Sequence, residues 1–126
     1  QKLPFVTARE CPDLRPIPTE EGKEKWILFT ASGEYFTGDF DGFRFTNLSG
    51  GHMAYQNELP YAGQTYSSLP ERVVLMHWMR TENPEKYYTG MMGIPRELTL
   101  IKGEEGFILR QSVIREWKEQ RVSVRE

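Results

Sequence analysis

Residues 26–46 read WILFTASGEYFTGDFDGFRFT, and this stretch decides the fold. Its first six residues, 26–31, form an apolar run of the kind found in a strand covered on both faces. A second run follows at 34–38, and the Asp41-Gly42 pair is a dipeptide favoured in two-residue hairpin turns. Alternation of apolar and polar residues at 43–46 then predicts a further strand. The stretch therefore predicts an antiparallel meander.

The same pattern extends in both directions along the chain. A short strand is expected at 10–14, ended by Pro16 and Pro18, and it completes a first unit of four strands. Residues 47–57 are polar and contain two glycines, so they predict a connection. A second set of strands is expected at 61–66, 73–79, 97–101 and 106–110. Two successive four-stranded units, each of about 50 residues, are typical of β-propeller blades.

The C-terminal segment differs from these two units. Ser112 is expected to cap a short helix that carries Val113, Ile114 and Trp117 on one face, and a new strand is expected at 122–124. We predict an all-β fold of two consecutive four-stranded antiparallel propeller blades, a partial propeller, with a short C-terminal linker helix. The expected divisions are 1–50 for the first meander, 51–111 for the second, and 112–126 for the linker helix and the start of the next strand.

Composition excludes several classes of partner. The net charge is −2, from 16 basic and 18 acidic residues spread along the chain, which argues against nucleic-acid binding. The longest apolar run, 73–76, is too short to span a bilayer, so no membrane partner is expected. The single Cys and the two His have no partners at metal-ligand spacing, and we expect neither a metal nor a cofactor.

Six short segments occur in a fixed order and together identify a family. They are ECPDL at 10–14, GDFDG at 38–42, YA at 61–62, WM at 78–79, PREL at 95–98 and LRQSV at 109–113. Each segment alone is a weak signal, but the ordered set is specific. The chain resembles glycoside hydrolase family 32, the invertases, inulinases and levanases that cleave fructosides. The resemblance implies the fourth and fifth blades of a five-bladed propeller that leads into a β-sandwich.

The resemblance also implies a chemistry. Glu10 matches the general acid/base of a retaining mechanism, in which a second carboxylate attacks the sugar. That nucleophilic Asp belongs to a Trp-Met-Asn-Asp-Pro-Asn motif which this sequence lacks, as it lacks the Arg-Asp-Pro motif. The implied protein is a fragment of a β-fructosidase of the sucrose, levan or inulin type, inactive by itself. Its implied partners are a fructoside or fructan and the remaining blades, or a second copy through exposed blade faces. The family acts outside the cytoplasm, which implies secretion or a periplasmic location.

Three departures from the family pattern favour an alternative. Arg9 precedes the Glu-Cys pair where Trp is common, His77 replaces a Gly, and Leu59 replaces a sugar-contacting Asp. Glu58 stands one place before Leu59 and is a candidate to replace the lost carboxylate. The alternative function is a degenerate, non-catalytic propeller module that binds fructosides.

Tyr61 is the preferred sugar-contacting aromatic residue, because its segment matches a family strand that lines the pocket. Tyr66 and Trp78 are further candidates for a stacking platform, although core packing between blades is the preferred interpretation for Trp78.

The remaining polar residues near these motifs are expected to be structural. Asp13 is expected to cap a turn or pair with Arg15, and Cys11 to pack in the interior. His77 is expected to be a hydrogen-bonded interior residue. Arg96 and Glu97 are expected to form an ion pair.

Overall fold

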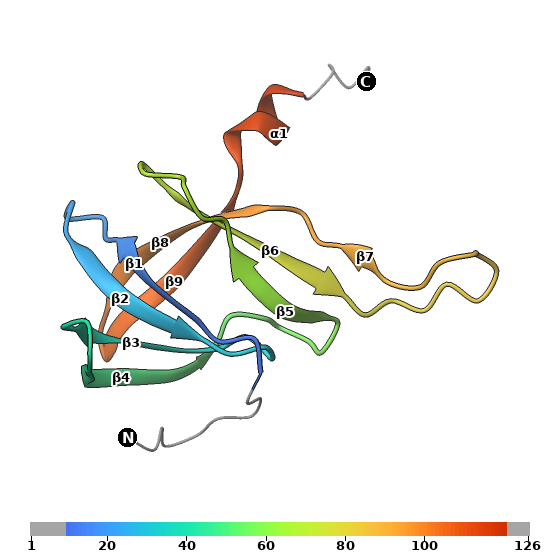
Figure 1. The fold of residues 1–126 in the computed structure, drawn as a ribbon. Helices are drawn as coiled ribbons and strands as arrows, with labels where there is room; N and C mark the ends of the chain where they lie inside the picture. The colour runs from blue at the N-terminus through green and yellow to red at the C-terminus, as the bar shows by residue number, and fades with distance from the viewer. Residues whose placement is uncertain (1–9, 121–126) are drawn as a thin grey trace.

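The computed structural model describes residues 10–120, which fold into two antiparallel sheets lying side by side (Figure 1). The first sheet has the order β1-β2-β3-β4, from β1 (Asp13–Pro18), β2 (Glu24–Phe29), β3 (Glu34–Phe40) and β4 (Phe45–Met53). The second has the order β5-β6-β8-β9, from β5 (Pro60–Thr65), β6 (Val73–Met79), β8 (Arg96–Gly103) and β9 (Gly106–Val113). A two-residue strand, β7 (Met91–Met92), pairs with the end of β6. The predicted all-β fold of two meanders is confirmed.

The first strand begins and ends later than predicted. Pro16 and Pro18 do not stop it but lie within it, paired with Trp26 and Glu24 of β2. In the described sheet β1 has a strand on one side only. A proline lacks the backbone N–H, and an edge strand tolerates this on its unpaired side. The prediction of a strand over 10–14 that ends before Pro16 was therefore wrong.

The turn after β3 is longer than a two-residue hairpin turn. Phe40 pairs with Phe45, which leaves residues 41–44 as the loop. The Asp41 carboxylate accepts the backbone N–H groups of Phe43 at 2.8 Å and Arg44 at 2.7 Å, and this closes the loop. Phe43, expected in a strand, is 93% exposed.

The predicted connection at 47–57 is largely strand. β4 continues to Met53 and passes through Gly50, at a shift of register against β3. A Cβ on Gly50 would lie 2.8 Å from the Tyr35 carbonyl oxygen, and its φ is +132°. Only glycine lets the two strands approach so closely there. The first sheet thus runs past residue 50, and the second, through β9, past residue 111 to Val113.

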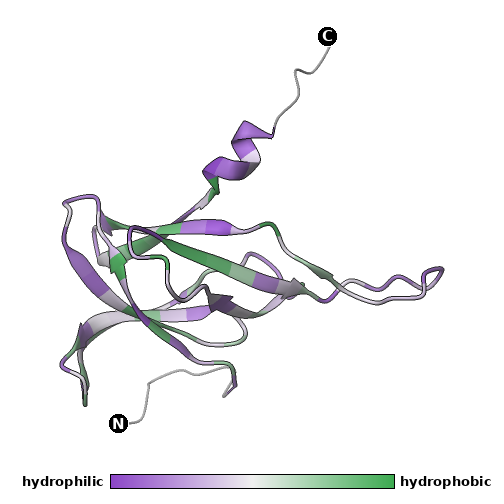
Figure 2. Cartoon of the chain, turned by 45° about the horizontal axis from the view of Figure 1, so that its top comes forward, coloured by the Kyte–Doolittle hydropathy of each residue, from purple (hydrophilic) through white to green (hydrophobic). Residues whose placement is uncertain are grey.

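The core lies between the two sheets. Alternate residues of both sheets point into it, together with Tyr55 from the connection: Ile17, Ile27, Phe29 and Tyr35 from the first, and Val73, Leu75, Leu98 and Leu100 from the second. Figure 2 shows that apolar residues concentrate on the strands, whereas α1 is largely hydrophilic. Burying these side chains is the main driving force that holds the sheets together.

Tyr55 fixes the spacing of the two sheets. Its ring lies against Gly33 of the first sheet and its hydroxyl against Gly63 of the second, where an added Cβ would lie 2.2 Å and 2.3 Å away. Beside it, the Ala54 N–H donates to the Gly33 carbonyl at 2.8 Å. Neither glycine can be enlarged without moving the ring, so the connection is clamped between the sheets.

The C-terminal helix is shorter than predicted and starts later. α1 (Arg115–Glu119) has Ile114 at its N-cap without a side-chain hydrogen bond, and Ser112 belongs to β9. The predicted cap at Ser112 was wrong, because pairing of Ser112 with Glu97 continues the sheet. None of the helix residues is buried. No helix in residues 10–120 is long and apolar enough to cross a membrane. The strand predicted at 122–124 and the position of Arg9 lie outside the described residues.

Candidate active site

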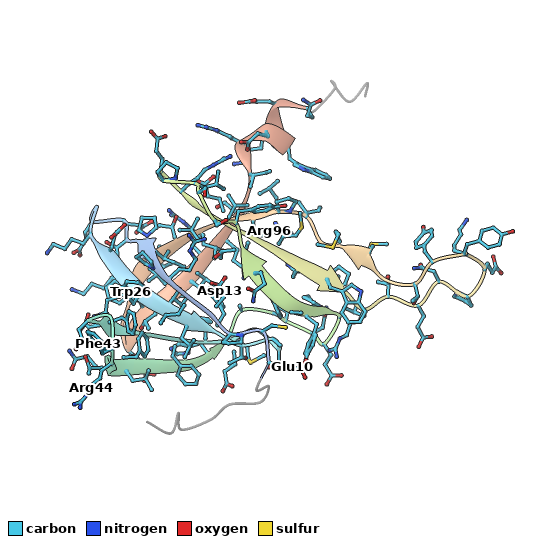
Figure 3. The ribbon with its side chains drawn as sticks, viewed as in Figure 1. Glu10, Asp13, Trp26, Phe43, Arg44 and Arg96 are labelled. Carbon is cyan, nitrogen blue, oxygen red and sulfur yellow. The ribbon has the colours of Figure 1, made fainter. Side chains whose placement is uncertain are left out.

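Glu10 lies just before β1, at the junction of the two sheets. Its carbonyl accepts the Ala31 N–H at 3.2 Å, and the Ala31 carbonyl accepts the Ala62 N–H at 2.8 Å. The backbone of Ala31, between β2 and β3, therefore binds Glu10 through its N–H and the start of β5 through its carbonyl. The next residue, Cys11, has a φ of +47°, so the chain turns sharply into β1. Figure 3 shows Glu10 near β5, with Asp13 further along between β1 and β5.

Tyr61 lies beside Glu10. The charge of the Glu10 carboxyl group acts on the Tyr61 phenol. Loss of hydration is the main cause that raises the pKa of Tyr61 above its ordinary value, and the negative charge of Glu10 raises it further. Tyr61 is thus held as a neutral phenol beside the Glu10 carboxyl group. The sequence predicted both residues, and the structure brings them together.

Arg80 covers the other side of Tyr61. Its guanidinium carbon lies 4.4 Å from the centre of the Tyr61 ring. Its Nε donates to the Glu58 carbonyl oxygen at 3.0 Å, a second guanidinium nitrogen donates to the same oxygen, and its backbone N–H donates to the Leu59 carbonyl at 2.8 Å. The sequence analysis missed this residue. The available signal was a cation directly after the Trp-Met pair of the family pattern.

Trp78 adds a second aromatic ring to the site. Its ring meets that of Tyr61 nearly edge-on, at 6.5 Å between centres and 78° between planes. Gly90, with a φ of +72°, packs on the indole, and an added Cβ would lie 2.2 Å from the indole Nε1. Trp78 is 43% exposed in residues 10–120, and its packing between blades stays a prediction. Tyr61 and Gly90 contact the indole of Trp78, and part of the ring surface stays exposed to solvent.

Glu58 and Tyr66 lie near opposite ends of β5. Glu58 is exposed, and it acts on the site through its backbone carbonyl, which fixes Arg80. Leu59 beside it is 41% exposed. Tyr66 follows the far end of β5, where its carbonyl accepts a hydrogen bond from Arg15. Tyr61 and Trp78 are therefore the aromatic pair of the site.

Asp13 and Arg15 are structural, but each binds the second sheet rather than the other. The Asp13 carboxylate accepts the Thr65 N–H at 2.7 Å, and Arg15 donates to the Thr65 hydroxyl at 2.9 Å. Cys11 is only half-buried, and its carbonyl accepts a hydrogen bond from Gln64 at 3.0 Å. These contacts fix the segment that carries Glu10 against β5.

His77 and Glu97 differ from their predicted pairing. His77 is 8% exposed, as expected of an interior residue, but its Nδ1 has no hydrogen-bond partner among residues 10–120. Burial, and then the charge of Arg96, lowers the pKa of His77, so it is neutral. Glu97 forms an ion pair with Arg72, at 3.6 Å, and not with Arg96. In residues 10–120, no group of three or more His, Cys, Asp or Glu side chains could hold a metal ion.

Comparison with known proteins identifies the family. Residues 2–112 match the model of the glycosyl hydrolases family 32 N-terminal domain. The chain belongs to glycoside hydrolase family 32. A levanase from Bacillus sp. (strain L7) is 30% identical over 91% of this chain, which covers 15% of that protein. An extracellular exo-inulinase from Meyerozyma guilliermondii is 32% identical over 72% of this chain, which covers 21% of that protein.

Solved structures of the family share the fold. The exo-inulinase from Aspergillus awamori matches 87% of this chain with a TM-score of 0.67 and 25% identity. A β-fructofuranosidase from Schwanniomyces occidentalis, complexed with fructosyl-erythritol, matches 86% with a TM-score of 0.72 and 28% identity. In both cases this family 32 chain covers 26% of the solved chain. It therefore spans about a quarter of these structures.

Proposed function

We propose that this chain supplies the general acid/base, Glu10, of a retaining glycoside hydrolase that acts on β-fructosides of the sucrose, levan or inulin type. The observation that carries the proposal is the placement of Glu10 at the junction of the two sheets, where its backbone is tied through Ala31 to Ala62 and its carboxyl group acts on the neighbouring Tyr61 phenol. The names of the relatives, levanase, exo-inulinase and β-fructofuranosidase, support the substrate class. The nucleophile comes from other blades of the propeller.

In this mechanism Glu10 protonates the leaving oxygen while the nucleophile attacks the anomeric carbon. Glu10 then removes a proton from the water that releases the sugar. Tyr61 donates to the carboxylate that the first proton transfer leaves on Glu10, and it keeps the side chain aimed at the site until the second transfer returns a proton to Glu10. The open surface of Tyr61 provides apolar contact for the sugar ring. The nucleophile would stand about 5 Å from Glu10, the separation of a retaining pair.

The chain forms the fourth and fifth blades in this proposal. Trp78, Met92 and Ile108 are 43%, 63% and 49% exposed on the second sheet, and they form the face that a further blade, or a second copy, would cover. The exo-inulinase relative from Meyerozyma guilliermondii is extracellular by name, which supports action outside the cytoplasm.

The proposal is tested in a chimera in which this chain replaces the matching part of the Bacillus sp. levanase. Changing Glu10→Gln removes the proton donor, so kcat/KM for levan and sucrose should fall by about 10²- to 10⁴-fold. A 4-nitrophenyl fructoside should lose much less in the first step, because its leaving group needs no proton. Circular dichroism and Tm establish that the variants fold.

The matched control is Glu21→Gln, an exposed carboxylate in the turn between β1 and β2. It should leave all rates unchanged. The proposal fails if the folded Glu10→Gln chimera hydrolyses levan at the unmodified rate, or if the folded parent chimera is inactive.

A second candidate function, a non-catalytic fructoside-binding module, is favoured by Leu59, which stands exposed beside the site in place of a family Asp. Calorimetry of this chain with fructo-oligosaccharides would detect it. Binding that Tyr61→Ala removes, together with an inactive chimera, would support the module over the enzyme.

A further inference from the structure

The position of Arg80 over Tyr61 is fixed from several directions. The guanidinium lies 4.4 Å from the ring centre, and two of its nitrogens donate to the one carbonyl oxygen of Glu58. The backbone of Arg80 is tied to Leu59 at the same end of the sheet. An exposed arginine normally samples many rotamers, so this anchoring marks a defined placement of the cation.

The charges that face Tyr61 come from two segments. Loss of hydration is the main cause that raises the pKa of the phenol. Glu10 and Cys11, from the segment before β1, raise it further, and Arg80, just after β6, lowers it. A cation over the ring stabilises negative charge on the phenol oxygen. It therefore makes the hydroxyl a stronger hydrogen-bond donor toward the Glu10 carboxyl group beside it.

We propose that Arg80 is a positioning residue that strengthens the Tyr61–Glu10 hydrogen bond when Glu10 gives up its proton. This inference rests on the proposed function. In the first step the O–H bond of Glu10 breaks and an O–H bond forms on the leaving alcohol. The glycosidic C–O bond breaks, its electron pair stays with the leaving oxygen, and the nucleophile bonds to the anomeric carbon. Tyr61 stabilises the carboxylate left on Glu10, and Arg80 polarises Tyr61.

The first test does not depend on catalysis. Tyrosine labelled with ¹³C at Cζ reports the titration of each phenol in this chain by NMR, and Tyr61→Phe assigns the signal among the six tyrosines. Arg80→Met should move the titration midpoint of Tyr61 to higher pH, and Glu10→Gln should move it to lower pH. Arg80→Gln repeats the test with a polar side chain in case the Met variant fails to fold.

The matched control is Arg44→Met, which removes an exposed arginine from the loop between β3 and β4, well away from Glu10 in Figure 3. It should leave the Tyr61 midpoint unchanged. A midpoint that is the same in Arg80→Met, Arg80→Gln and the parent chain would overturn the proposal.

The second test uses the chimera with the levanase blades. Arg80→Met should lower kcat for sucrose by roughly 2- to 5-fold, the rate equivalent of an exposed cation–π contact, with less change in KM. The 4-nitrophenyl fructoside should be less affected, and the basic limb of the sucrose pH–rate profile should move to higher pH. Equal losses for both substrates, with no shift of the profile, would reduce Arg80 to a structural role.

The two tests separate this inference from the proposed function. If the Tyr61 midpoint responds to Arg80 but the chimera hydrolyses no substrate, the Arg80–Tyr61 interaction is supported and the proposed hydrolase function is rejected. If the rate of hydrolysis depends on Glu10 but not on Arg80, the proposed function is supported and the role proposed for Arg80 is rejected.

Discussion

The hydroxyl of Tyr35, in β3 of the first sheet, accepts the backbone N–H of Leu109, in β9 of the second, at 3.1 Å. The two residues are 74 positions apart in the chain. Tyr35 is 3% exposed, and its ring lies in the core shared by the sheets. A single side chain thus gives both apolar packing and a polar link across the interface, where an unpaired backbone group is costly.

Removing this hydroxyl should destabilise the pair of sheets. Tyr35→Phe keeps the ring but leaves the Leu109 N–H without its acceptor, at a cost of about 1–3 kcal/mol in the free energy of unfolding. Denaturant unfolding followed by circular dichroism measures it. Tyr87→Phe, at a fully exposed tyrosine, is the control and should change nothing. Equal stability of the two variants would mean that the hydrogen bond contributes nothing net.

The clamp on Tyr55 predicts a difference between two glycines. Gly22 and Gly33 both have positive φ, of +75° and +85°, but an added Cβ meets nothing at Gly22 and the Tyr55 ring at Gly33. Gly22→Ala should therefore cost only backbone strain, about 1–2 kcal/mol. Gly33→Ala should cost about 1–3 kcal/mol more, because the ring must shift. Urea midpoints compare the two, and equal losses would show that Tyr55 moves freely.

The C-terminal helix should be held in a pH-dependent manner. The Arg72 guanidinium lowers the pKa of Glu116 to about 2, from an ordinary value of 4.5, through a paired hydrogen bond. Because the folded pKa is lowered, the contribution is complete above about pH 4.5 and is lost as the pH falls toward 2. The chemical shift of the Trp117 indole N–H should follow this loss. Glu116→Gln should abolish that transition, whereas Glu119→Gln should retain it.

The sequence predicted strand existence and fold class well, because alternation and turn residues are local signals. It failed where tertiary pairing overrides them. Pro16 and Pro18 predict the end of a strand, yet an unpaired strand edge accommodates both. Gly50 predicts a connection, yet its small size lets β4 continue close against β3. Whether a proline or a glycine ends a strand depends on which strand pairs with it, and the pairing of strands cannot be predicted from local sequence patterns.

The residues of the candidate site also fall into those that local sequence motifs predict and those whose role depends on strand pairing. Glu10 and Tyr61 were found through family motifs, which carry chemistry. Arg80 was missed, because its role arises from a ring placed above it by the pairing of β5 with β6. The packing of Trp78 between blades stays a prediction, because its ring lies on the face of the second sheet that the first sheet does not cover.

The exposed face of the second sheet leads to a prediction about assembly. By strand alternation Trp78 and Ile108 lie on the face opposite Leu75 and Leu100, and Met92 pairs with Trp78. This apolar surface should make the isolated chain self-associate with rising concentration. The double variant Met92→Lys and Ile108→Lys should shift sedimentation toward monomer, while Phe43→Lys, at a 93% exposed loop residue of the first sheet, should not. A parent chain that stays monomeric at high concentration, or a Phe43→Lys variant that dissociates equally, would rule out this face as the cause.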